Sequence, residues 1–215
     1  MVIGAGAGKG AASYSMSVFI GSWAGRYTTG NYNTFIGHDA GQENRTGEGN
    51  TYVGQQAGFY SNTASDNVGI GKTSLYAPNS GYNVAIGNYA GYHNYGDHNV
   101  FIGYGAGYEN EYGTGNVLIG SGVSVSSENG DKSNILMIDN ESTDTPLIYG
   151  EFDTDIVKIN GKLEVSTTTG ALIVPRLTTD ERNALATVNG MIIYNVTTNK
   201  FNFYENNAWV TKANN

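Results

Sequence analysis

The chain has 215 residues, a net charge of −8 and no cysteine. The acidic balance and the lack of any Lys/Arg run argue against nucleic-acid partners and against binding to anionic membrane surfaces. Disulfides and thiolate metal sites are excluded, and no apolar run reaches the 18 residues typical of a membrane-spanning helix.

The first 120 residues carry an internal repeat that is marked by the dipeptide Ile/Val-Gly, and successive glycines of this dipeptide lie 16 or 17 residues apart. The unit reads Asn-x-x-Ile-Gly-x-x-Ala-Gly-aromatic and ends in a polar stretch. The structural repeat positions are Asn33, Ile36, Gly37, Gly41, Asn50, Val53, Gly54, Asn67, Ile70, Gly71, Asn83, Ile86, Gly87, Asn99, Ile102, Gly103, Asn116, Ile119 and Gly120. This period predicts a mostly β fold, a parallel β-solenoid with two short strands and two turns in each coil. We expect the asparagines to stack as a hydrogen-bonded ladder.

The repeat also explains a fragment that looks like the end of a phosphate-binding loop. Gly71-Lys72-Thr73 has the right residues, but such a loop needs glycine where this chain has Asp66. The fragment is therefore one unit of the repeat, and no nucleotide or other cofactor is expected.

The strand segments are apolar at consecutive positions, as in "NTFIG" and "NVFIG". Side chains of a strand alternate between its two faces, so Val100 and Ile102 point one way and Phe101 the other. Strands that are apolar on both faces are normally buried on both faces. A coil has only one interior, so we expect sister chains to cover the outer face, with three-fold symmetry preferred. A monomeric solenoid with an exposed apolar ridge is the alternative.

Beyond residue 120 the pattern changes. A polar transition (121–133) precedes three short strands at 134–140, 146–152 and 155–165, and 166–172 has the composition of a linker. Residues 178–190 predict a helix, because Thr178 and Glu181 form a capping box and Gly190 stands past its end. The segments "MIIYNV", "KFNFYE" and "AWVTK" then predict a β-meander. The expected organisation is 1–133 for the repeats, 134–169 for a connector and 170–215 for a C-terminal tip.

The aromatic residues provide the candidate binding residues. Rings follow the Ala-Gly corner in several repeats, and a second group lies near the C-terminus. Rigid amphipathic rings suit contact with sugar faces, although stacking between coils explains the same column. The candidates are Tyr60, Tyr92, Tyr108, Tyr204 and Trp209.

No catalytic or metal site is expected. The acidic pairs, such as Asp153 with Asp155, lack the apolar surroundings that keep one carboxyl group of a glycosidase protonated. The three histidines fall at different positions of the repeat unit, as expected of incidental surface residues.

The repeat resembles the YadA-like head of trimeric autotransporter adhesins, whose fold is a left-handed parallel β-roll made by three chains and whose unit is usually slightly shorter. Residues 136–165 resemble segments that follow such repeats in bacteriophage tail fibres, and 170–210 resemble a terminal module of the same fibres. The resemblance implies an extracellular homotrimer on a virion tail or a phage-like injection system, with a bacterial cell surface as the alternative. Because Met1 enters in mid-repeat, we expect a longer fibre on the N-terminal side.

Three functions follow from this resemblance. The first is multivalent, non-catalytic attachment to a cell-surface receptor, with a glycan as the expected partner. The second is a structural spacer whose terminal module sets the register of the trimer. The third is a tailspike that depolymerises polysaccharide.

Overall fold

The computed structural model describes residues 1–10, 15–125, 132–166 and 172–211. The chain divides into two units, residues 1–162 and 163–215. Parts of the predicted polar transition (126–131) and of the predicted linker (167–171) lie outside the described residues.

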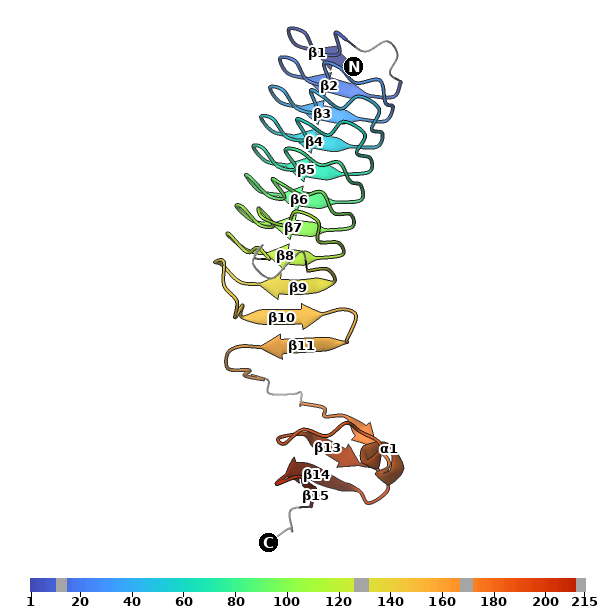
Figure 1. Ribbon diagram of the computed structural model, residues 1–215, viewed down its shortest axis with the longest axis vertical. Coiled ribbons are helices and arrows are strands. Elements are labelled where there is room, and N and C mark those ends of the chain that lie inside the picture. The colour runs from blue at the N-terminus through green and yellow to red at the C-terminus, as the bar shows by residue number, and fades with distance from the viewer. Residues whose placement is uncertain (11–14, 126–131, 167–171, 212–215) are drawn as a thin grey trace. The chain divides into compact units, whose positions relative to one another are not determined.

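The first unit is a β-solenoid built on one eleven-stranded sheet (Figure 1). Strands β1 to β9 pair in parallel, each with the strand of the next coil, and β10 and β11 add antiparallel neighbours. The mostly β solenoid that the repeat predicts is thus confirmed. The strands are β1 (Val2–Ile3), β2 (Val18–Ile20), β3 (Thr34–Ile36), β4 (Thr51–Val53), β5 (Val68–Ile70), β6 (Val84–Ile86), β7 (Val100–Ile102), β8 (Val117–Ile119), β9 (Ile135–Ile138), β10 (Ile148–Glu151) and β11 (Ile156–Ile159).

Each coil contributes one strand, so the prediction of two strands per coil is wrong. The Ala-Gly segment forms a turn instead: the Ala90 amide donates to Gly87 O of its own coil at 3.2 Å. Tyr89 and Gly91 both adopt left-handed φ values near 60°, which an extended strand does not allow. Their amides still reach the neighbouring coils, where Lys72 O and Ala106 O accept them at 2.9 Å each.

The interior of the solenoid is filled by the middle residue of each strand. Phe19, Phe35 and Tyr52 are fully buried and stack from coil to coil, with ring centroids 5.3 and 5.2 Å apart. The Tyr52 hydroxyl donates to Asn50 Oδ1 at 3.3 Å, and burial raises the pKa of Tyr52. The core therefore runs as one continuous column along the coil axis.

Two coils place small residues in the core column, and a leucine from another position of the repeat enters the core near them. Strand β5 carries Gly69 and strand β6 carries Ala85 where other coils have large side chains. Leu75 replaces the second glycine of this repeat, and its side chain is fully buried. A Cβ atom on Gly91 of the next coil would lie 2.9 Å from Leu75 Cδ2, so the leucine reaches that level of the core.

The repeated asparagines hold successive coils together from inside. Asn67 is fully buried, and its Oδ1 accepts the backbone amide of Asn83 in the next coil at 2.9 Å. Its Nδ2 donates to Ser80 O at 2.9 Å and to Asn50 Oδ1 at 3.2 Å. Equivalent bonds from Oδ1 to the following coil occur at Asn33, Asn50, Asn83, Asn99 and Asn116.

The first glycine of the repeat is required by contact between coils. Gly87 has a φ of 138°, and a Cβ atom added there would lie 2.2 Å from Gly103 O. Both the backbone conformation and the close approach therefore exclude a side chain.

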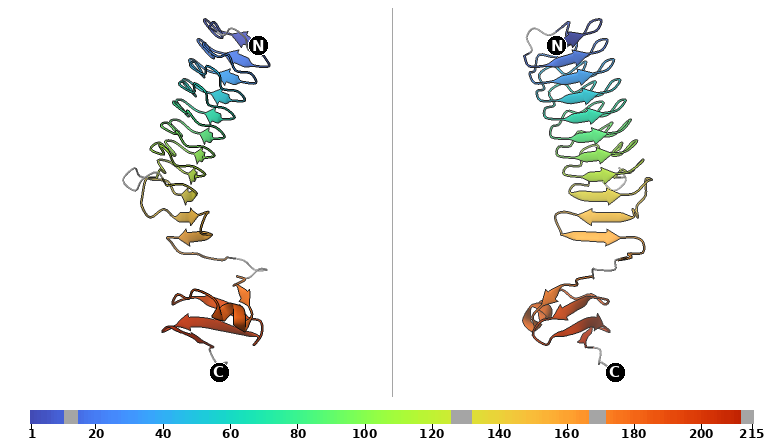
Figure 2. Two further views of the ribbon diagram at one scale, coloured as in Figure 1. Left: turned by 45° about the vertical axis from the view of Figure 1, so that its right-hand side comes forward. Right: turned by 180° about the vertical axis from the view of Figure 1, so that it is seen from behind.

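The second unit consists of a four-stranded sheet and one helix (Figure 2). The sheet order is β12-β13-β14-β15, and Asn206 and Asn207 both adopt positive φ in the β14–β15 turn, as a two-residue hairpin of type I′ requires. The meander is thus confirmed. The elements are β12 (Arg176–Leu177), α1 (Thr179–Asn183), β13 (Ile192–Asn195), β14 (Lys200–Glu205) and β15 (Ala208–Val210).

Helix α1 begins as the sequence predicts and ends earlier. Thr178 is the N-cap, and its capping box with Glu181 is formed; the hydrogen bonds from Thr178 lower the pKa of Glu181. The helix stops after Asn183, so Gly190 does not cap it. All five helical residues remain at least partly exposed. The helix therefore has no buried face whose packing would stabilise further turns. Among the described residues, no helix is long and apolar enough to cross a membrane.

Candidate binding surface

An outward-facing row of Ile and Val runs across the whole eleven-stranded sheet. One such residue occupies the same register position in every strand, and we call this row the Ile/Val stripe. Its members are Ile3, Ile20, Ile36, Val53, Ile70, Ile86, Ile102, Ile119, Ile138, Ile148 and Ile159.

The Ile/Val stripe is open in the single chain. Ile102 keeps 38% of its surface exposed, whereas Phe101 beside it is fully buried in the coil. A neighbouring row two residues earlier adds further Val and Thr side chains, such as Val100 and Thr51, that are half-buried. Parallel sheets are normally covered on both faces, so this surface is suited to protein–protein contact.

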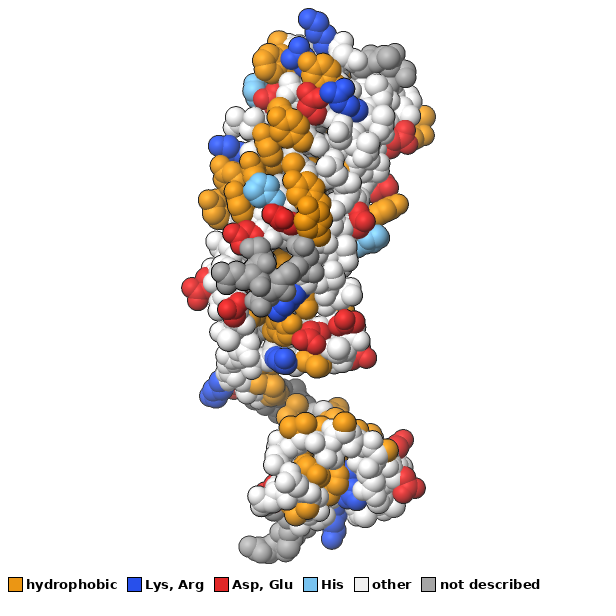
Figure 3. Space-filling view, in the orientation of Figure 1, with side chains coloured by type: hydrophobic (Ala, Val, Ile, Leu, Met, Phe, Trp, Pro, Cys, Tyr) orange, Lys and Arg blue, Asp and Glu red, His pale blue; other side chains and the backbone are white. Residues whose placement is uncertain are grey.

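A second surface is formed by aromatic residues that follow the Ala-Gly corner. Phe59, Tyr76, Tyr92 and Tyr108 come from four successive coils and stack in one ladder. Their centroids are 5.5, 4.9 and 5.1 Å apart, and their planes lie within 12° of parallel. We call these four rings the aromatic ladder. Figure 3 shows hydrophobic side chains gathered in patches over the coils of the solenoid.

Two further side chains lie against the edges of the aromatic ladder. Tyr60 packs edge-on against Phe59 and Tyr76, with centroids 4.5 and 5.4 Å away, and His93 packs edge-on against Tyr92 at 4.6 Å. Burial raises the pKa of the Tyr76 and Tyr92 hydroxyls, and the neighbouring tyrosines raise it further. These phenols therefore stay neutral hydrogen-bonding groups at all physiological pH values.

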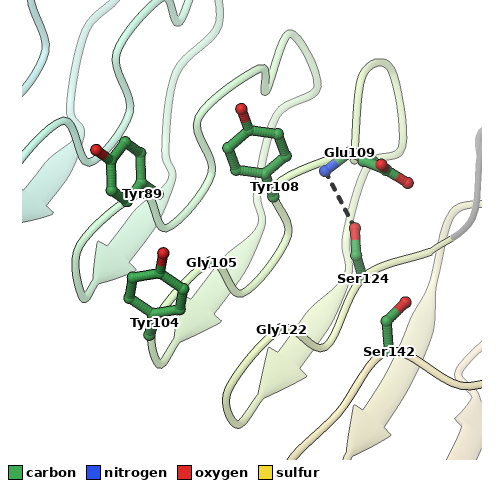
Figure 4. A pocket seen from close by; sticks show the side chains of 8 residues that line it. All are labelled: Tyr89, Tyr104, Gly105, Tyr108, Glu109, Gly122, Ser124 and Ser142. Carbon is green, nitrogen blue, oxygen red and sulfur yellow. Dashed lines mark hydrogen bonds between the residues drawn. The ribbon is translucent and has the colours of Figure 1, made fainter.

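The ladder ends in a pocket of about 420 Å³ (Figure 4). Tyr89 lies at one side of the pocket, with its ring centroid 5.9 Å from that of Tyr104 and 6.5 Å from that of Tyr108. The side chains of the lining come from three successive coils and the loop that follows β9: Tyr89, Tyr104, Tyr108, Glu109, Ser124 and Ser142.

The second unit holds the remaining aromatic candidates. Tyr204 and Trp209 are paired across the β14–β15 hairpin, with ring centroids 5.1 Å apart in an edge-to-face arrangement. The Arg182 guanidinium lies 5.6 Å from the centre of the Trp209 ring. Both rings are half-buried, and these packing contacts explain their positions without a ligand.

The structure thus separates the five predicted binding residues into two groups. Tyr60, Tyr92 and Tyr108 lie together at the aromatic ladder, whereas Tyr204 and Trp209 belong to the other unit. Within the described residues, no group of three or more acidic or histidine side chains is placed to hold a metal ion.

Sequence reasoning missed Tyr89, Tyr104 and Glu109 as lining residues. Tyr89 and Tyr104 stand before the Ala-Gly corner, outside the ring column that the repeat made visible. The available signal was Gly105, which stands where most other repeats carry a side chain.

Comparison with known proteins bears on the C-terminal third of the chain. Residues 142–215 match the family described as "Phage tail like trimerisation region". This match supports a trimeric, phage tail-like fibre and suggests a location on a virion tail. No curated protein and no solved structure matches the chain.

Proposed function

We propose that this chain is a segment of a trimeric tail-like fibre that attaches to a cell surface, without catalysis, through a glycan receptor. The observation that carries the proposal is the ring-lined surface of the solenoid, which combines the aromatic ladder with a pocket. Amphipathic rings on a rigid support provide contact area at a low cost in conformational entropy. In a trimer three equivalent sites engage together, so weak binding at each site yields strong attachment to a repetitive glycan.

The Ile/Val stripe supports assembly of the solenoid itself, including coils that precede the trimerisation match. Ile148 and Ile159 lie within residues 142–215, and Ile102 and Ile86 continue the same row into the coils before them. Two sister copies of this chain are therefore the proposed cover of the stripe.

Light scattering on the purified chain tests the assembly. The expected mass is about 69 kDa, three times the chain mass of 22.9 kDa. Ile102→Asp places a charge on the stripe and is expected to weaken the trimer. Tyr82→Asp adds the same charge at an exposed position outside the stripe and is the matched control. A monomeric wild-type protein contradicts the assembly.

Cell attachment is tested separately. The fluorescently labelled trimer is incubated with a panel of bacterial strains and with their purified surface polysaccharides. Saturable binding to at least one strain, with no new reducing ends in the polysaccharide, is the expected result. Binding to none of the strains rejects attachment, and newly formed reducing ends indicate a depolymerase.

A structural spacer is the second candidate, and the second unit provides its support. Exposed apolar side chains, Leu172, Ile173, Val188, Ile192 and Phe201, suit a module that is completed by sister copies. If removal of residues 163–215 abolishes the trimer, this unit sets the register. If the trimer persists and cell binding is lost, the unit is the receptor-binding tip.

A further inference from the structure

We propose that the pocket beside Tyr89 is a subsite for a neutral pyranose ring of a cell-surface glycan. This inference rests on the proposed attachment function and assigns its binding site to the flank of the solenoid, at the end of the aromatic ladder.

The pocket exists because two successive coils lack a side chain at one position of the repeat. Two residues after the first glycine, the first coil carries Gly6, and the five consecutive coils after it carry Trp23, Asp39, Gln56, Thr73 and Tyr89, all five at φ values between 53° and 60°. The next two coils carry glycine at this position instead, Gly105 and Gly122.

Neither glycine is required by close packing. A Cβ atom added at Gly105 would meet no heavy atom of the described residues within 4 Å, and one at Gly122 would meet only Ser142 N, at 3.8 Å. The five side chains at this position in other coils show that the solenoid accepts non-glycine residues there. At Gly6 of the first coil, by contrast, a Cβ atom would lie 2.5 Å from Trp23 Cδ1, so the space is open only beside Gly105 and Gly122 among the described glycines at this position.

The lining combines ring faces with polar groups, as a sugar site requires. Tyr104 is 62% exposed and Tyr108 is 38% exposed, so both rings offer surface to a ligand. The face of an aromatic ring carries partial negative charge, which attracts the polarised C–H groups on the apolar side of a pyranose. Figure 4 shows Glu109, Ser124 and Ser142 across from the three tyrosines, where the serine hydroxyls can bond sugar hydroxyls.

The charge of the lining favours a neutral sugar. Among the described residues of the lining, Glu109 is the only one with a carboxylate, and it is exposed. The chain as a whole carries a net charge of −8. An anionic sugar would meet repulsion from both, whereas a neutral one can donate hydroxyl hydrogen bonds to the carboxylate.

The pocket is held by backbone bonds between coils, so it is formed before a ligand binds. The amide of Gly105 donates to Asn88 O at 2.9 Å, and that of Gly122 donates to Tyr104 O at 2.7 Å. The amide of Glu109 donates to Ser124 Oγ at 3.1 Å. Such preorganisation lowers the entropic cost of binding.

Saturation-transfer NMR on the full-length protein tests the site. The probes are the methyl glycosides of glucose, galactose and N-acetylglucosamine, with N-acetylneuraminic acid as the anionic comparison. Gly105→Gln is expected to fill the pocket, because Gln56 occupies the equivalent position at a φ of 57°. Tyr104→Ala removes the most exposed ring, and Tyr82→Ala removes an equally exposed ring that does not line the pocket.

We expect saturation transfer to at least one neutral glycoside, at least about tenfold weaker binding in Gly105→Gln and Tyr104→Ala, and unchanged binding in Tyr82→Ala. Circular dichroism shows whether each variant is folded. If one of the two pocket variants is misfolded, the binding of the other one tests the site. Transfer to none of the neutral glycosides, preference for the anionic sugar, or undiminished binding in the pocket variants overturns the proposal.

Cell binding by the same variants separates this inference from the attachment function. If wild-type protein binds cells and both pocket variants bind equally well, attachment stands and this site is wrong. If wild-type protein binds no cells, attachment fails, and the NMR result still decides the pocket. Cell binding that is lost after protease treatment and survives periodate oxidation identifies a protein receptor, which also overturns the proposal.

Discussion

Replacing Asn67 by alanine tests whether the asparagine ladder holds neighbouring coils together. The side chain is fully buried and makes three hydrogen bonds. It accepts from the Asn83 amide and donates to Ser80 O and to Asn50 Oδ1. Asn50 Oδ1 also accepts the backbone amide of residue 67 at 3.0 Å, so it keeps a partner after the substitution.

The magnitude follows from the two groups that lose their partner. The Asn83 amide and the Ser80 carbonyl are left unsatisfied in the interior, and each such group costs about 1–3 kcal/mol. Asn67→Ala is therefore expected to lower the free energy of unfolding by about 2–6 kcal/mol for each chain. Serine should cost about half as much, because a hydroxyl can accept the amide but cannot reach Ser80 O. The chain contains this precedent, since Ser17 Oγ accepts the Asn33 amide at 3.1 Å.

Denaturant unfolding followed by circular dichroism measures the effect, with wild type and all variants compared at equal chain concentration. Asn79→Ala is the matched control, because its side chain is exposed in the same coil; a change below about 0.5 kcal/mol is expected there. A free energy of unfolding for Asn67→Ala equal to that of Asn79→Ala would contradict a ladder that holds the coils together. An equal loss of stability in Asn67→Ser and Asn67→Ala would contradict it as well.

Three further outcomes follow from the same coil geometry. Leu75→Ala should lower the free energy of unfolding by about 2–5 kcal/mol, because no large side chain stands at Gly69 to fill the cavity; a thermal melt equal to wild type would contradict this. Gly87→Ala should cost at least about 3 kcal/mol or prevent folding, because its Cβ would collide with Gly103 O, and soluble, wild-type-like protein would disprove the packing. Burial raises the pKa of Tyr52, so the unfolded chain loses the phenol proton at a lower pH than the folded chain does. The free energy of unfolding should therefore fall as the pH rises above about 10. Tyrosinate absorbance should show that part of the tyrosine titrates only when the protein unfolds, and complete titration in the folded protein would contradict the burial of Tyr52.

Much of the solenoid could be predicted from sequence because its information is local and repeated. The consecutive apolar residues of Val100–Ile102 place Phe101 inside and Ile102 outside, and the structure has this arrangement. The capping box at Thr178 was visible for the same reason, since it depends on two residues in one turn.

The number of strands per coil was harder to predict from the sequence. Whether the Ala-Gly segment is a strand or a turn depends on positive φ values, such as those of Tyr89 and Asp39, which are unusual for side chains other than glycine. They persist because their amides are bonded to neighbouring coils, and a single repeat does not contain those partners.

The extent of helix α1 was overestimated for a related reason. The sequence signals mark where a helix starts, but its length depends on how much of one face is buried. In α1 every residue remains at least partly exposed, so the capping box supports only five residues.

The amino-acid sequence by itself determined the period of the coils, the face on which each strand residue lies and the outward Ile/Val stripe. These features follow from the alternation of a strand and from a repeat in which each coil contacts its neighbours. Only the tertiary structure decided that Leu75 reaches the core at the level of Gly91, that four rings stack, and that Gly105 opens a pocket next to Tyr89. These arrangements depend on which side chains from different coils reach the same point in space. That is set by the stacking of the coils and cannot be read from any one of them.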